Sequence, residues 1–129
     1  MSRHTGKCLC GGVAYAFDTE ISKATACHCS QCRRTSGHFW AAFHVPLDDF
    51  ELTNQASLCW FESSDWAKRG FCNRCGSSLF YQLQGETSIN IAPGTLDGPT
   101  GLTLTRHIFV GSKGDYYDLN DGLEQLDTY

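Results

Sequence analysis

The sequence lacks any excess of positive charge. Ten lysines and arginines stand against fourteen aspartates and glutamates, which gives a formal net charge of −4 at pH 7. Nucleic-acid binding needs a basic face that displaces counterions, and this composition argues against such a partner. Long apolar runs are missing as well, because no window approaches the roughly 18 apolar residues of a transmembrane helix. The sequence therefore predicts neither a nucleic-acid partner nor a membrane span.

An apolar export segment is also missing from the N-terminus. Residues 1–7 are polar and lead directly into Cys8, whereas a secretory signal carries an apolar stretch. We therefore expect a cytoplasmic, reducing location, in which eight cysteines are not a disulfide framework. The disulfide interpretation stays open only for a chain from which an upstream signal has been removed.

Long stretches with a helical apolar period are scarce, whereas glycine is frequent, with thirteen residues. This combination indicates short strands joined by turns. The ranges predicted as strands are 13–17, 39–45, 57–61, 78–83, 88–92 and 102–110, and a one-turn helix is predicted within 47–52. The length of 129 residues and the 41% hydrophobic content suit one globular core. We predict a mainly β chain, built of short antiparallel sheets in a single domain over residues 1–129.

Cysteine is the residue that this sequence has in abundance, and seven of its eight cysteines fall in three tight clusters. The clusters are Cys8-Leu9-Cys10, Cys27-His28-Cys29-Ser30-Gln31-Cys32 and Cys72-Asn73-Arg74-Cys75. Sulfurs at such spacing can converge on one tetrahedral metal, with Zn–S bonds of about 2.3 Å. Zinc is therefore the predicted metal.

The first and third clusters pair naturally. In an extended segment, residues i and i+2 point to the same side, so Cys8 and Cys10 can offer two sulfurs to one ion. Cys72 and Cys75 do the same in a tight turn, whose next residue, Gly76, tolerates a positive φ. Because each pair needs two further ligands, the two pairs together predict a structural zinc site with four cysteine ligands.

Cys27, Cys29 and Cys32 then remain as a set of three. Three protein ligands with an open fourth position are typical of catalytic zinc. Two alternatives fill that position with His28 or with Cys59. We expect the His28 ring to point away, because it lies between two ligands that face one way. Cys59 stays open as a ligand, although its apolar strand favours a small buried hydrophobe.

Four motifs frame these cysteines and extend over nearly the whole chain. They are GKCLCGGVAY at 6–15, CHCSQCRR at 27–34 followed by Gly37, the segment from Ser63-Ser64 through RGFCNRCGS at 69–77, and HIFV at 107–110. Together they resemble the motifs of the glutathione-dependent formaldehyde-activating family (the GFA, or CENP-V/GFA, domain). The tail departs from the family pattern, with Asp115-Tyr116 where members often carry Pro-Trp.

The resemblance implies an Mss4-like, all-β fold with two zinc ions per chain, one in a structural four-cysteine site and one in a catalytic three-cysteine site. It also implies a carbon–sulfur lyase, similar to S-(hydroxymethyl)glutathione synthase, that joins formaldehyde to glutathione. The expected partners are accordingly a small thiol, possibly glutathione, and a small aldehyde. The sequence leaves the actual thiol and aldehyde open.

Few other residues have a predictable role. Arg33 and Arg34 directly follow Cys32, so they either compensate the thiolates and bind a substrate carboxylate or form a solvated surface pair. His107 has a claim only through the family motif. Besides the enzyme, a non-catalytic zinc-stabilised binding module stays open. A redox enzyme that uses Cys59 is weaker, because no resolving cysteine is left over.

Overall fold

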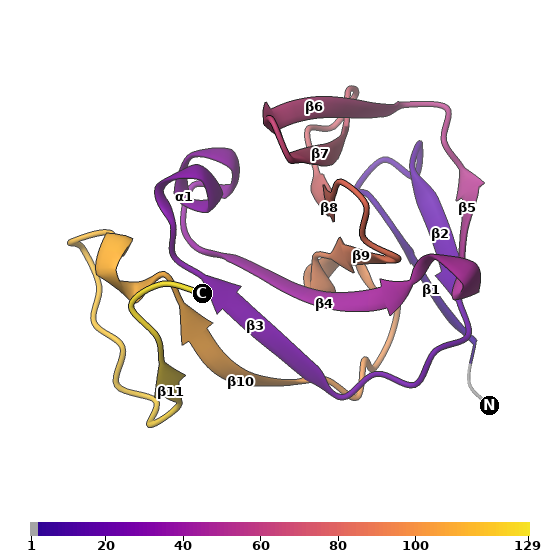
Figure 1. The fold of residues 1–129 in the computed structure, drawn as a ribbon. Helices are drawn as coiled ribbons and strands as arrows, with labels where there is room; N and C mark the ends of the chain where they lie inside the picture. Colours follow the sequence, from indigo (N-terminus) through magenta and orange to yellow (C-terminus); the bar gives the residue numbers. More distant parts are fainter. Residues whose placement is uncertain (1–2) are drawn as a thin grey trace. The chain divides into compact units, whose positions relative to one another are not determined.

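The structure is a computed structural model that describes residues 3–129, and these residues form short strands, one short α-helix and three 3-10 turns (Figure 1). The elements are β1 (His4–Lys7), β2 (Ala14–Phe17), β3 (Lys23–Cys27), α1 (Ser30–Ser36), β4 (Trp40–Pro46), η1 (Leu47–Asp49), β5 (Phe50–Asn54), β6 (Leu58–Ser64), β7 (Ala67–Cys72), β8 (Ser78–Leu83), β9 (Ser88–Ile91), η2 (Pro93–Thr95), β10 (Thr103–Ile108), η3 (Val110–Ser112) and β11 (Glu124–Gln125). The predicted mainly β class is confirmed. Within the described part of the chain, no helix is long and apolar enough to cross a bilayer.

The chain divides into two compact units. Unit 1 contains the described residues up to Ile21 together with Phe43–Gly101, and unit 2 contains Ser22–Ala42 and Leu102–Tyr129. Strand β4 begins in unit 2 and ends in unit 1. The prediction of a single domain over 1–129 stays a prediction.

Unit 1 is built of antiparallel pairs. Strands β1, β2 and β5 form one sheet, and the second half of β4 continues through β9, β8, β7 and β6. Its buried aromatic residues come from several of these strands. The Tyr15 and Phe80 rings pack edge to face at 5.6 Å between centroids, and those of Phe17 and Phe43 lie 5.7 Å apart. Such pairs add stability beyond the area that they bury.

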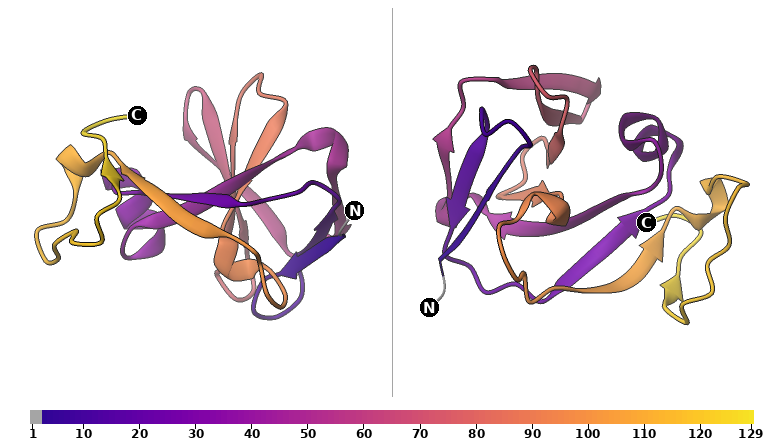
Figure 2. Two further views of the ribbon diagram at one scale, coloured as in Figure 1. Left: turned by 90° about the horizontal axis from the view of Figure 1, so that it is seen from below. Right: turned by 180° about the vertical axis from the view of Figure 1, so that it is seen from behind.

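Unit 2 has a mixed sheet, which differs from the predicted antiparallel arrangement. Strand β3 pairs antiparallel with the first half of β4, but β10 pairs parallel with both β3 and β11. Figure 2 shows β3 and β10 running side by side. Parallel neighbours need a long connection, and the intervening residues 28–102 provide it. The local sequence pattern of a strand does not indicate which distant strand will pair parallel with it.

Several short elements were not predicted. Helix α1 is only seven residues long, too short for a helical period to be recognised. The range 47–52, predicted as a one-turn helix, is helical only over η1 and then continues as β5. The strand predicted at 57–61 is present as β6, which runs on to Ser64. The strands predicted at 13–17, 39–45, 78–83, 88–92 and 102–110 are present, within one or two residues at each end.

Tyr15, the buried tyrosine of unit 1, allows this packing to be tested through the pH dependence of stability. Tyr15 is 1% exposed, its hydroxyl lies 2.6 Å from Thr95 Oγ1, and burial raises its pKa to about 12. The native state therefore keeps a proton that the unfolded chain loses above pH 10. Stability from this group is complete below pH 10 and falls as the pH rises toward 12, by about 2–3 kcal/mol.

We expect Tyr15→Phe to remove most of that loss, measured as the difference in unfolding free energy between pH 9 and pH 11.5 in urea. The matched control is Tyr129→Phe, because Tyr129 is 83% exposed. Equal losses in the native chain and in Tyr15→Phe would contradict the expectation.

Candidate metal centres

Four of the predicted ligands come together in unit 1. Cys8 and Cys10 follow β1, Cys72 ends β7, and Cys75 lies in the turn before β8. Their Sγ atoms all lie within 4.8 Å of one another, with 3.7 Å between Cys8 and Cys10 and 3.5 Å between Cys10 and Cys72. Tetrahedral Zn–S bonds place the sulfurs about 3.8 Å apart. The spacing therefore suits a single tetrahedral ion.

Neighbouring donors favour the thiolate form of two of these cysteines. The Ser57 hydroxyl lies 3.1 Å from Cys72 Sγ and lowers the pKa of that thiol to about 7. The Ser77 hydroxyl, 3.2 Å from Cys75 Sγ, lowers the pKa of Cys75 to about 5. Metal ligands of this type must be deprotonated. Two of the four sulfurs are therefore favoured as thiolates, the form in which cysteine binds a metal.

Two glycines make this local geometry possible. Gly76 has φ +80°, the left-handed conformation expected after the Cys72–Cys75 turn. A Cβ atom on Gly12 would lie 2.1 Å from Ser57 Oγ. The missing side chain of Gly12 thus leaves room for the Ser57 hydroxyl, which contacts Cys72 Sγ.

The other three predicted ligands come together in unit 2. Cys27 is the last residue of β3, Cys29 is the N-cap of α1, and Cys32 lies in the first turn of α1. Their sulfurs also lie within 4.8 Å of one another, and the Cys32 N–H donates to Cys29 Sγ at 3.2 Å. Hydrogen bonds from Cys27, the larger cause, and from Cys32 lower the pKa of Cys29 to about 2. The same bond between Cys27 and Cys29 raises the pKa of Cys27. One thiolate is thus already favoured in the cluster.

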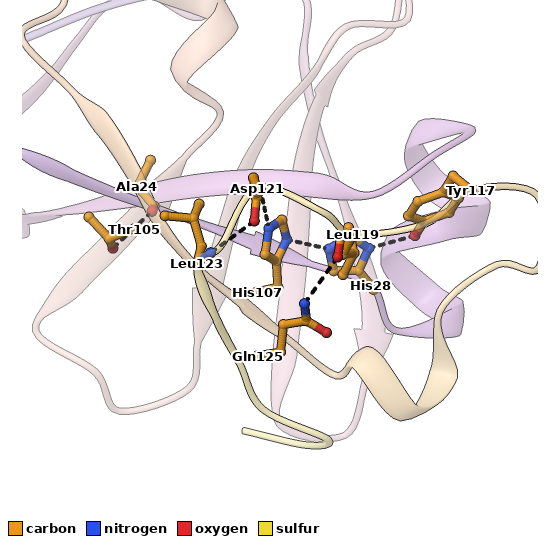
Figure 3. A network of polar contacts seen from close by, with 9 residues as sticks. All are labelled: Ala24, His28, Thr105, His107, Tyr117, Leu119, Asp121, Leu123 and Gln125. Atoms are coloured by element: carbon orange, nitrogen blue, oxygen red, sulfur yellow. Dashed lines mark hydrogen bonds and ion pairs between the residues drawn. The ribbon is translucent and has the colours of Figure 1, made fainter.

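No fourth ligand joins these three cysteines among residues 3–129. His28 is turned away as predicted, with Nδ1 2.5 Å from the Tyr117 hydroxyl and Nε2 2.9 Å from His107 Nδ1 (Figure 3). Cys59 belongs to neither cluster; it lies on β6 opposite Phe71 and is half-buried rather than fully buried. The structure thus contains one group of four thiols and one of three, and both can hold a metal ion.

Sequence reasoning missed the contacts of His28, the residue between Cys27 and Cys29. His28 and His107 are buried at 1% and 2% exposure, and Asp121 Oδ2 lies 2.7 Å from His107 Nε2. Burial, with the neighbouring His107, lowers the pKa of His28 to about 4. His107 and Tyr117 lie 79 and 89 positions from His28 in the sequence. The family motif pointed to His107 alone, and no local signal identified Tyr117 or Asp121.

The two arginines after Cys32 differ from each other. Arg34 is exposed, as a surface residue would be, whereas Arg33 is half-buried on α1. The Arg33 Nε atom is buried and has no hydrogen-bond partner within the described chain. A buried guanidinium N–H without an acceptor is costly. Because this N–H is closed to solvent, an external acceptor would have to approach the outer nitrogens of the half-buried Arg33 side chain.

Comparison with known proteins assigns the chain to a family. The family model of the glutathione-dependent formaldehyde-activating enzyme matches residues 3–112, and the chain belongs to this family. It is 28% identical over 125 residues to a Schizosaccharomyces pombe protein named as an uncharacterized lyase, covering 92% of this chain and 86% of that protein.

A second relative, from Podospora anserina, is provisionally named as a glutathione-dependent formaldehyde-activating enzyme. It is 30% identical over 86 residues, which are 64% of this chain but only 40% of that protein. The fold is similar to the crystal structure of a Rhodobacter sphaeroides protein, with a TM-score of 0.64 at 22% identity, covering 95% of this chain and 98% of that one.

The two thiol groups are expected to respond differently to substitution. Cys75→Ser should destabilise the zinc-loaded protein and lower its Tm by more than about 10 °C, because a closed four-thiolate site couples metal binding to folding. Cys29→Ser should keep the fold and lose the metal ion of the three-thiol group alone. Circular dichroism melting with metal analysis measures both effects. A fully folded, equally stable Cys75→Ser protein, or an unfolded Cys29→Ser protein, would contradict this division.

Proposed function

We propose that this protein is a zinc-dependent carbon–sulfur lyase that joins glutathione, or a related thiol, to formaldehyde or another small aldehyde. The observation that carries the proposal is the contrast between the two thiol groups. Cys27, Cys29 and Cys32 converge with no fourth ligand from residues 3–129, as a site that must accept a substrate requires. Membership of the family and the names of the relatives support the reaction.

In this proposal each group holds one zinc ion. The closed site, formed by Cys8, Cys10, Cys72 and Cys75, is structural, whereas the open site of Cys27, Cys29 and Cys32 is catalytic. Sites built only of thiolates favour zinc over hard cations such as magnesium and calcium. All eight cysteines are free of disulfides, which suits a reducing compartment such as the cytoplasm.

The reaction forms one bond between sulfur and carbon. The thiol sulfur of glutathione adds to the carbonyl carbon of formaldehyde, and the thiol proton ends on the former carbonyl oxygen, so that S-(hydroxymethyl)glutathione contains all atoms of both reactants. Zinc held by Cys27, Cys29 and Cys32 would lower the pKa of a substrate thiol. Because three thiolates leave such a centre with a net charge of −1, thiol delivery is favoured over water activation.

The chain's own residues orient the substrate in this scheme. Arg33 directly follows the ligand Cys32 on α1, and its side chain is half-buried. Glutathione carries carboxylates, and a guanidinium binds a carboxylate through two parallel hydrogen bonds. We therefore assign to Arg33 the recognition of a substrate carboxylate.

The reaction itself is tested by exchange NMR of formaldehyde with glutathione. The zinc-loaded native protein should accelerate exchange at least about tenfold over buffer, and Cys29→Ser should not, because it lacks the open site. Buffer rates with both proteins would exclude this thiol and aldehyde pair and favour another thiol substrate or the non-catalytic binding module, whereas equal acceleration by both would exclude the three-cysteine site as the catalyst.

The role of Arg33 is tested by a substitution that keeps its charge. Arg33→Lys should raise the KM for glutathione about tenfold and leave kcat within about twofold, because it removes the two-pronged contact and spares the metal. Arg34→Lys is the matched control, since Arg34 is the exposed neighbour. An unchanged KM in Arg33→Lys would exclude this role.

A further inference from the structure

The C-terminal segment 113–129 lies beyond the residues that match the family, which end at 112. It nevertheless contributes Tyr117, which contacts His28 between Cys27 and Cys29, and Asp121, which contacts His107.

Four side chains form one continuous row of hydrogen bonds in unit 2 (Figure 3). Asp121 Oδ2 lies 2.7 Å from His107 Nε2, His107 Nδ1 lies 2.9 Å from His28 Nε2, and His28 Nδ1 lies 2.5 Å from the Tyr117 hydroxyl. One assignment of hydrogens satisfies the whole row. Tyr117 donates to His28, His28 donates to His107, and His107 donates to the carboxylate.

Both ends of the row are fixed in turn. Asp121 Oδ1 accepts the Leu123 N–H at 3.0 Å. Lys113 Nζ donates to the Tyr117 carbonyl and lies 4.7 Å from the centre of the Tyr117 ring. The Leu126 N–H donates to the His107 carbonyl at 2.9 Å. The tail is thus bound through its backbone as well as through its side chains.

At the centre of the row, His28 is held on every side. Its backbone N–H donates to the Ile108 carbonyl at 3.0 Å, its ring lies 5.1 Å from that of Phe39, and it is 1% exposed. Successive side chains of an extended segment point in opposite directions. His28 lies between Cys27, the last residue of β3, and Cys29, the N-cap of α1, so holding its backbone and ring restricts the segment from which both thiols project.

We propose that Tyr117 and Asp121 are positioning residues, which act through His28 and His107 to hold Cys27 and Cys29 in place for metal binding. The tail thereby controls how fast the three-thiol site releases its metal. This inference rests on the proposed metal at that site, but not on the reaction with aldehydes.

The physical basis is pre-organisation. Groups outside the ligand shell that orient metal ligands typically change metal affinity about 10- to 100-fold. Here the contact is one residue removed from each ligand, so we expect an effect near the lower end of that range. Without the row, His28 and its neighbours regain rotational freedom that metal binding must remove again.

The test uses the full chain loaded with Co²⁺ at both sites and measures metal loss to excess EDTA by the thiolate–cobalt absorption. The Cys29→Ser protein supplies the spectrum and rate of the four-thiol site alone. Tyr117→Phe and Asp121→Ala should each lose cobalt from the three-thiol site about tenfold faster than the native chain. The four-thiol site should keep its rate, which a general loss of stability would not allow.

Two neighbours serve as matched controls. Tyr116→Phe makes the same change in a hydroxyl that contacts His38 instead, and Asp118→Ala removes a nearby carboxylate that lies outside the row. Both should release cobalt at the native rate.

Native rates in Tyr117→Phe and Asp121→Ala would overturn the positioning role and leave the proposed function intact. Equal acceleration at both sites would also overturn it, because the defect would then be general. A native chain that takes up cobalt only at the four-thiol site would overturn the metal assignment itself.

Discussion

The structure depends on bringing thiols from separate segments to within a few ångströms of each other. In unit 1, Cys10 follows β1 and Cys72 ends β7, yet their sulfurs lie 3.5 Å apart. Several thiolates at such a distance repel one another unless a cation neutralises them. A metal bound here would therefore link the end of β1 to the end of β7. Without it, only packing of the small hydrophobic core would hold these two strand ends together.

The difference between the two thiol groups follows from how each is built. The group of four combines two pairs from distant segments, and each pair supplies half of a tetrahedron. The group of three comes from one short stretch that passes from the end of β3 into α1. Within that stretch His28 alone stands in a position to offer a fourth donor, and both of its ring nitrogens already have other partners. The arrangement that commits His28 to the interior of unit 2 also leaves the three thiols without a fourth ligand from residues 3–129.

In unit 2 the C-terminal tail contacts the residues next to the segment that carries Cys27, Cys29 and Cys32. The parallel pairing of β10 with β3 puts His107 opposite Ala26, one residue before Cys27. The tail then returns through β11 along the other edge of β10 and brings Asp121 to His107. A segment outside the family match thus completes the surroundings of a cluster that the family motifs define.

The sequence by itself determined which thiols come together in the two clusters. The Cys-x-Cys and Cys-x-x-Cys spacings indicated which sulfurs converge, the alternation of an extended segment turned His28 away, and Gly76 marked the turn after Cys75, because each of these features is local. Only the tertiary structure decided the parallel partner of β3, the buried Nε of Arg33 and the row from Asp121 to Tyr117. Those contacts join residues up to 89 positions apart. Long-range pairings are set by how whole strands pack and leave no periodic or spacing signal at either residue.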